Sequence, residues 1–279
     1  MMEHIFINYS LFILFLPLVA FVIQIFFGKR LPREGDWVSI GAISITLVLA
    51  INMFVQMLLD YDSDFSVEAS FVWLDMGAFN IRLGFLVDNI TIIMLLVVAL
   101  ISTCTHIFST QYLKGDIRYS RYFGYLGLFT FSMNGIVLAN NLMSMYMFWE
   151  LVGVSSYLLI GHWFEKDSAA NASKKAFLTN RVGDIGFFIG IMLIYSAVGS
   201  FAFTDVFDGV ASGVIAGTTL TLAGVGLFMG AMGKSSQFPL HIWLPDAMEG
   251  PTPVSALMHA ATMVAAGVYL SVRIFPILT

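Results

Sequence analysis

Residues 219–248 read TLTLAGVGLFMGAMGKSSQFPLHIWLPDAM, and this stretch decides the class of fold. It is apolar over a membrane-spanning length, yet Lys234 lies in its middle and Pro239 follows closely. A lysine near the centre of a bilayer costs about 2.5–3.5 kcal/mol on translocon scales. Pro239 has no amide hydrogen and its ring clashes with the carbonyl of Ser235, so we expect the helix to break there. Loosened backbone beside a buried lysine is tolerated only where protein or water surrounds it, which points to ion transfer.

Composition indicates that the rest of the chain is also embedded in a membrane. Hydrophobic residues make up 58% of the chain and charged residues only 11%, against about 25% charged in soluble domains. The single cysteine, Cys104, excludes an intrachain disulfide and a multi-cysteine metal site. We therefore predict an all-α polytopic membrane protein with about eight transmembrane helices, the seventh of them broken. The helices are expected at about 11–28, 37–59, 89–110, 122–140, 142–163, 176–198, 219–248 and 254–275.

The basic residues orient these helices. Nine of the 13 lysines and arginines follow the first, third and fifth predicted helices, so those loops are expected to face the cytoplasm or its organellar equivalent. The N-terminus is then expected on the outer side. The nine residues are Lys29, Arg30, Arg33, Lys114, Arg118, Arg121, Lys166, Lys174 and Lys175.

The outer loop 60–88 is too long for a simple turn. Residues 71–75 and 79–86 flank Met76-Gly77-Ala78, and polar and apolar residues alternate over 80–85, as they do in a strand. The sequence therefore predicts a small β-hairpin, which caps the helix ends or touches a neighbouring subunit.

Charged and titratable side chains inside the predicted spans are the functional candidates, because such groups are expensive in hydrocarbon and are retained for pairing or conduction. Arg181 and Asp184 lie three residues apart on one helix and can pair, which suits fixed packing as well as function. Glu150 has no cation within one helical turn, so its partner is expected from another helix. The candidates for that partner are Lys234, Lys174 and Lys175.

Two further features bear on proton transfer. Gly153, one turn after Glu150, would let another helix or water approach closely. His259 suits a proton relay because an imidazole titrates near physiological pH, although it is also compatible with a hydrogen-bonded core histidine.

Nucleotide binding is rejected. The stretch GAMGKSS resembles a phosphate-binding loop, but the first glycine of G-x-x-x-x-G-K-[ST] would fall at Phe228. No haem, iron–sulfur or dinucleotide signature is present in the sequence, so we expect this chain to bind no cofactor, metal or nucleic acid.

Four stretches carry a resemblance to a known family. QFPLHIWLPDAMEGPTPVSALMHAATMVAAGVYL at 237–270 is similar to the signature of the proton-pumping, antiporter-like subunits of respiratory complex I. SRYFGYLGLFTFSM at 120–133, FWELVGVSSYLLIGHW at 148–163 and KKAFLTNRVGDIGFF at 174–188 resemble the largest of these, the subunit L or mitochondrial NADH dehydrogenase subunit 5 family. The resemblance extends from the first predicted helix to the end of the chain.

The resemblance implies roles for the intramembrane residues. Glu150 matches the family's essential glutamate, Lys234 its partner lysine on the broken helix, and His259 the position that links the input half-channel to the centre. Switching of the Glu150–Lys234 pair would drive proton transfer.

Supporting roles are implied as well. Asp184, beside Arg181, matches an aspartate that tunes the Glu–Lys interaction, and Trp243 matches a tryptophan close to the lysine. Pro239 would maintain the break. Asn140 stands where the family often has aspartate, which removes a carboxylate from that helix end.

The implied function is that of a proton-translocating membrane-arm subunit of NADH:quinone oxidoreductase. NADH, FMN, iron–sulfur clusters and quinone would reside in partner subunits, and this chain would perform no redox chemistry. The family fold has two inverted repeats, each with a broken helix. Residues 122–279 correspond to the first repeat, preceded by a helix at 89–121 and by two helices with the hairpin at 1–88.

Family members are longer and carry a second repeat and a long lateral helix. We therefore expect a truncated or naturally split subunit, partnered by a C-terminal half or a complementary chain and by other membrane-arm subunits. A bacterial inner membrane is the expected location. Two alternatives stay open: a subunit of a multisubunit sodium/proton antiporter, and a structural half-subunit that conducts nothing.

Overall fold

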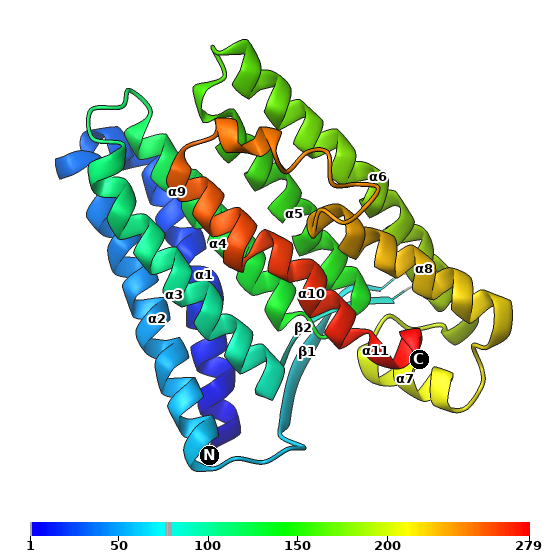
Figure 1. Ribbon diagram of the computed structural model, residues 1–279. Coiled ribbons are helices and arrows are strands. Elements are labelled where there is room, and N and C mark those ends of the chain that lie inside the picture. The colour runs from blue at the N-terminus through cyan, green and yellow to red at the C-terminus, as the bar shows by residue number, and fades with distance from the viewer. Residues whose placement is uncertain (1, 76, 78–79) are drawn as a thin grey trace.

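The computed structural model describes residues 2–75, 77 and 80–279 and is a bundle of long helices (Figure 1). The hairpin, both chain ends and the short helices α7 and α11 lie at one end of the bundle, and the loops after α3 and α5 lie at the other (Figure 1). The longer helices are α1 (Met2–Phe27), α2 (Asp36–Leu59), α3 (Asn89–Tyr112), α4 (Tyr119–Leu138), α5 (Leu142–Ile160), α6 (Asp167–Val198), α8 (Gly217–Lys234) and α10 (Met263–Arg273). The short helices are α7 (Phe203–Ala211), α9 (Thr252–Ser255) and α11 (Phe275–Leu278).

The predicted helical membrane fold is confirmed, and each predicted span contains a helix of the structure. Within the described residues, six helical segments are long and apolar enough to cross a membrane. The two predicted spans outside this set are α4 and α8. Nearly every residue of α4 is buried, because α4 packs between α1, α3 and α5, so its sequence tolerates polar side chains that a lipid-facing helix would not. Helix α8 is short and rich in glycine, and it packs along α6.

Glycines bring α6 and α8 unusually close together. A Cβ at Gly183 would lie 2.7 Å from the carbonyl oxygen of Met229, and a Cβ at Gly190 would lie 2.7 Å from the amide nitrogen of Leu227. A Cβ at Gly226 would in turn lie 2.8 Å from the carbonyl oxygen of Gly186. Small residues on both helices therefore allow backbone-to-backbone packing, which places the C-terminal end of α8 directly against the middle of α6.

Helix α8 breaks where the sequence predicted, and Lys234 is its last residue. The expectation that a helix resumes and extends to residue 248 is wrong in part. Turns follow up to a short 3-10 helix at Asp246–Glu249, because Pro239 and Pro245 each remove an amide donor from the segment.

The last predicted span is likewise irregular. After α9 the chain widens into a π-helix at Ala256–Ala261 before α10 begins. The hydroxyl of Thr262 donates to the carbonyl of Leu257 at 2.6 Å and satisfies one backbone group at this irregularity. Single π-turns inside α-helices are frequent at functional sites.

The predicted hairpin is present and longer than expected. Strands β1 (Ser66–Asp75) and β2 (Asn80–Asp88) pair antiparallel, with an irregularity between Val72 and Leu74. The expected turn residues Met76 and Ala78, and Phe79 after them, lie outside the described residues.

The hairpin contacts the ends of α1, α4 and α5, so the expected capping role is confirmed. The side-chain amide of Asn141 donates to the Arg82 carbonyl at 2.8 Å, and that of Asn140 donates to the Glu68 carboxylate at 2.6 Å. Asn140 thus acts as a donor here, which an ionised aspartate cannot do.

The loops after α1, α3 and α5 lie together at the opposite end. The Tyr119 hydroxyl donates to Asp36 at 2.9 Å, and the Trp163 indole donates to Asp116 at 3.0 Å. Helix α6 begins at Asp167, earlier than the expected residue 176. Its first turns extend the helix beyond the apolar segment, where Lys175 pairs with Asp246 at 2.6 Å.

Candidate functional site

The buried charges predicted from the sequence gather where α5, α6 and α8 meet. Lys234 is fully buried, at 0% exposure, at the end of α8. Its ammonium nitrogen lies 3.6 Å from Oδ2 of Asp184, which is itself 2% exposed. The two charges belong to different helices and face each other across the glycine-lined contact of α6 with α8.

Asp184 is held from the other side by Trp149 of α5. The indole nitrogen donates to Oδ1 of Asp184 at 2.8 Å, and the Lys234 ammonium lies 6.0 Å from the centroid of the Trp149 ring. A cation at this distance over an indole gains a further attraction from the ring. Sequence reasoning did not single out Trp149, although its position next to Glu150 was the available signal.

Glu150 forms its ion pair with Arg181 of α6. The guanidinium of Arg181 also lies 4.7 Å from the centroid of the Phe177 ring. The prediction that the partner of Glu150 comes from another helix is confirmed, but the expected candidates for it are wrong in this arrangement.

The expected pairing of Arg181 with Asp184 along α6 is also wrong. Each side chain instead reaches a neighbouring helix, Arg181 to α5 and Asp184 to α8. The physical reason is that α6 packs against both helices at once, so a charge of opposite sign on each neighbour competes with the intrahelical partner.

Gly153 makes room for the lysine. A Cβ placed at Gly153 would lie 2.9 Å from the Lys234 ammonium, closer than ordinary contacts allow. The expectation that this glycine permits close approach is therefore confirmed. The Lys234 side chain therefore lies against α5, the helix that also carries Glu150, and Glu150 is one helical turn away from the point of contact at Gly153.

The Lys234 ammonium lacks a hydrogen bond. Within the described part of the chain it is buried with Asp184 as an ion-pair neighbour but with no hydrogen-bond acceptor. Buried charged groups normally have such partners, and leaving them without any costs free energy. The Lys234 ammonium is therefore held in this arrangement by charge and packing, without a hydrogen bond to any described residue.

The segment after the break brings Trp243 and His259 to the same region. The Trp243 indole donates to the carbonyl of Gly233 at 3.0 Å, and its ring centroid lies 5.9 Å from that of His259. Trp243 thus lies beside the last turn of α8, as the resemblance implied. Pro239 is exposed and contributes through the backbone alone.

His259 occupies the π-helix between α9 and α10. Both of its ring nitrogens are buried and have no hydrogen-bond partner among the residues that the structure describes. The alternative of a hydrogen-bonded core histidine therefore finds no partner there. The hydroxyl of Ser235, the residue after Lys234, donates to the carbonyl of Val264 at 2.7 Å and ties the break to this irregular helix.

A helical bundle with opposed buried charges at a helix break defines the class of antiporter-like membrane subunits. Residues 139–279 match the family model described as NADH:quinone oxidoreductase/Mrp antiporter, TM. Residues 73–123 match the model described as NADH-Ubiquinone oxidoreductase (complex I), chain 5 N-terminus. This chain belongs to the NADH:quinone oxidoreductase/Mrp antiporter family, and its resemblance to the subunit 5 branch is confirmed.

Curated relatives named chloroplastic NAD(P)H-quinone oxidoreductase subunit 5 support the same assignment. The protein of Piper cenocladum is 44% identical over 89% of this chain and 34% of its own length. That of Anthoceros angustus is 46% identical over 89% of this chain and 34% of its own length. That of Manihot esculenta is 42% identical over 99% of this chain and 38% of its own length. The chain therefore spans little more than a third of these relatives.

Two solved structures resemble the fold. A chain of the Mrp complex from Dietzia sp. DQ12-45-1b aligns with a TM-score of 0.79 and 26% identity over 94% of this chain and 27% of that chain. A chain of the membrane-bound sulfane sulfur reductase, an archaeal respiratory membrane complex, aligns with a TM-score of 0.78 and 21% identity over 95% of this chain and 52% of that chain. The second likeness concerns the fold alone.

Proposed function

We propose that this chain is a proton-translocating membrane-arm subunit of an NADH:quinone oxidoreductase, in which Asp184, Lys234 and His259 carry the proton and Glu150 is the second partner of the lysine. The observation that carries the proposal is the fully buried Lys234, whose ammonium lies 3.6 Å from Asp184 and lacks a hydrogen bond to any described residue. A buried ionisable group inside a membrane is a functional site by default.

The mechanism follows from the two ion pairs. Lys234 lies beside Asp184, while Glu150 is neutralised by Arg181. Movement of the Lys234 side chain along α5, from Gly153 towards Glu150, exchanges its partner. Asp184 then lacks a nearby cation, which favours its neutral, protonated form.

Release of the proton completes the cycle. While it is away from Asp184, the Lys234 ammonium passes its proton to a ring nitrogen of His259, which has no hydrogen-bond partner among the described residues, and becomes a neutral amine. On its return the amine takes the proton of the Asp184 carboxyl group, which restores the ammonium–carboxylate pair. Trp243, which lies between the break and His259, positions the two ends of this path.

Quinone reduction in partner subunits supplies the energy in this proposal. NADH, FMN, iron–sulfur clusters and quinone are then bound by those partners and not by this chain. We further propose that the remaining half of the pathway comes from a C-terminal portion or a complementary chain, that residues 122–279 form the first repeat, and that the N-terminus faces the outer side of a bacterial inner membrane.

The test uses the assembled complex in inverted membrane vesicles, with NADH-driven acidification followed by quenching of a fluorescent amine. Glu150→Gln and Lys234→Met are expected to abolish most of the acidification. The matched control is Lys175→Gln, which removes a charge from α6 at the exposed pair with Asp246 and is expected to leave acidification intact. Wild-type acidification in both site variants would refute the relay.

A second candidate is a subunit of a sodium/proton antiporter, which the likeness to the Mrp complex chain favours. The two functions predict different drivers. Under the redox proposal, proton flux requires NADH and stops with a quinone-site inhibitor. Sodium-driven proton flux in vesicles without NADH would instead assign the antiporter function, whereas absence of flux in all variants and in the wild type would assign a structural role.

A further inference from the structure

A cavity of about 390 Å³ lies where α4 begins, α5 ends and α6 begins. The chain segments that line it lie at the end of the bundle that carries the loops after α3 and α5 (Figure 1). Its lining includes Arg121 and Lys174, both cations, and no carboxylate group.

Among the described residues, these two cations have no ionic partner, unlike their neighbours. Arg118 pairs with Glu165, and Lys175 pairs with Asp246 at 2.6 Å. For Arg121 and Lys174, in contrast, the described residues supply neither an ion pair nor a hydrogen bond. The cavity therefore presents uncompensated positive charge.

The guanidinium of Arg121 is held in place by aromatic rings. Its central carbon lies 5.5 Å from the centroid of the Phe164 ring and 5.8 Å from that of Tyr125. Its Nε is buried without a hydrogen-bond acceptor among the described residues. The two rings attract the cation while its N–H groups stay available, and a guanidinium with free N–H groups suits bidentate binding of an oxyanion.

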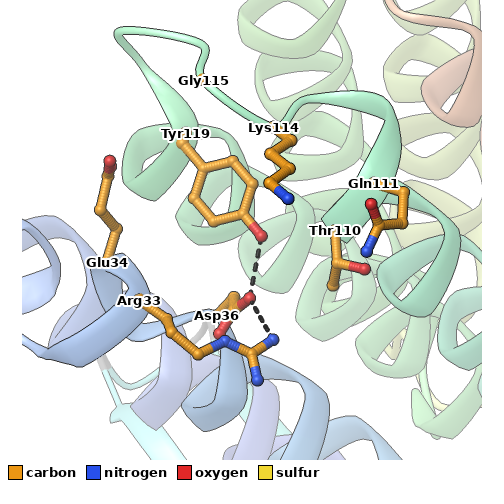
Figure 2. Close-up of a pocket in the computed structure, with 8 residues that line it drawn as sticks. All are labelled: Arg33, Glu34, Asp36, Thr110, Gln111, Lys114, Gly115 and Tyr119. Atoms are coloured by element: carbon orange, nitrogen blue, oxygen red, sulfur yellow. Dashed lines mark hydrogen bonds and ion pairs between the residues drawn. The ribbon is translucent and has the colours of Figure 1, made fainter.

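A larger cavity at the same end provides a contrast. It measures about 460 Å³ and also contains two cations, Arg33 and Lys114. There, however, Arg33 pairs with Asp36 at 2.8 Å, Tyr119 donates to the same carboxylate at 2.9 Å, and Glu34 adds a second negative charge (Figure 2). The positive charges of this cavity are balanced by its own carboxylates, so it has no excess positive charge that would attract an anion.

We propose that the cavity between α4, α5 and α6 binds a phosphate group through Arg121 and Lys174. Tyr157 and Leu158 extend the lining with apolar surface at the end of a membrane-spanning helix. Basic pockets between transmembrane helices on the cytoplasmic side accept the headgroups of anionic phospholipids, and the distribution of lysines and arginines predicts that this end of the bundle faces that side. The apolar lining makes a phospholipid the better source of the phosphate than the free ion.

The proposal is tested on the assembled complex, stripped of lipid and placed in phosphatidylcholine nanodiscs. Spin-labelled phosphatidylglycerol is titrated in, and the immobilised fraction is measured, with and without inorganic phosphate as competitor. Arg121→Gln and Lys174→Gln are each expected to weaken binding about tenfold, the loss of one charge-assisted contact. The matched control is Lys114→Gln, which removes a cation from the compensated cavity and is expected to leave binding unchanged.

The outcomes separate the possibilities. If the two variants lose lipid binding and inorganic phosphate does not compete with the lipid, the site binds a phospholipid. If inorganic phosphate displaces the lipid and this displacement depends on Arg121, the free ion is the source of the phosphate. Unchanged binding in both variants, or equal weakening by Lys114→Gln, overturns the proposal. Lys174 is exposed, so its variant keeps the test valid if the Arg121 variant folds poorly. Arg121→Lys, which keeps the charge but loses the fork, is expected to restore part of the affinity.

Discussion

Replacing Gly153 by alanine tests the position of Lys234 directly. The added Cβ would lie 2.9 Å from the Lys234 ammonium, and apart from the adjoining backbone of α5 no other described atom lies within 4 Å of it. The ammonium is the far end of a flexible side chain, so it is displaced from its place beside Asp184 while the backbone stays where it is. Transfer through Lys234 is then expected to slow about tenfold or more, since small misplacements at a reacting group are costly.

Stability is expected to move in the opposite direction. Alanine is favoured over glycine inside a helix by roughly 0.5–1 kcal/mol, so Gly153→Ala should raise the melting temperature slightly or leave it unchanged. A variant that is as stable as the wild type but pumps poorly cannot be explained by misfolding. NADH-driven acidification of vesicles and thermal unfolding of the purified complex measure the two effects.

The matched control is Gly41→Ala in α2, where an added Cβ meets nothing within 4 Å. It makes the same change in helix propensity and should leave acidification as in the wild type. Full activity in Gly153→Ala would show that the observed position of Lys234 does not matter for transfer and would refute the reasoning.

Two further predictions concern the end of the bundle that carries the hairpin. Burial alone raises the pKa of Asp88, but the hydrogen bond and charge of Arg273, with help from Thr91, outweigh it and lower the pKa below 3.8. This pair should therefore stabilise the fold above that pH and lose its contribution as the pH falls through the lowered pKa, so Asp88→Asn should cost on the order of 3 kcal/mol at neutral pH. Identical profiles of melting temperature against pH in the variant and the wild type would contradict this. Asn140→Asp should place a second carboxylate against Glu68 and cost about 1 kcal/mol in unfolding experiments at neutral pH. Adding Glu68→Gln should restore the loss, and a double variant no more stable than the single one would argue against the contact.

Much of the fold was predictable because hydrocarbon imposes strict rules on sequence. Spans, the hairpin and the break after Lys234 each leave a local signal: an apolar run, a two-residue alternation, or a proline. Features without such a signal were missed. The π-helix around His259 and the early start of α6 at Asp167 depend on contacts with other helices, which periodicity does not reveal.

The sequence by itself determined the class of membrane protein, the family, and the membership of the charged cluster, because each ionisable residue in a span stands out from its apolar surroundings. Which charge pairs with which was decided by tertiary structure. Glycines on α6 and α8 bring Asp184 to Lys234, while the packing of α5 on α6 brings Glu150 to Arg181. Which ion pairs form inside a bundle depends on which helix faces meet. Here the charged residues of α6 pair with residues of neighbouring helices and not with each other.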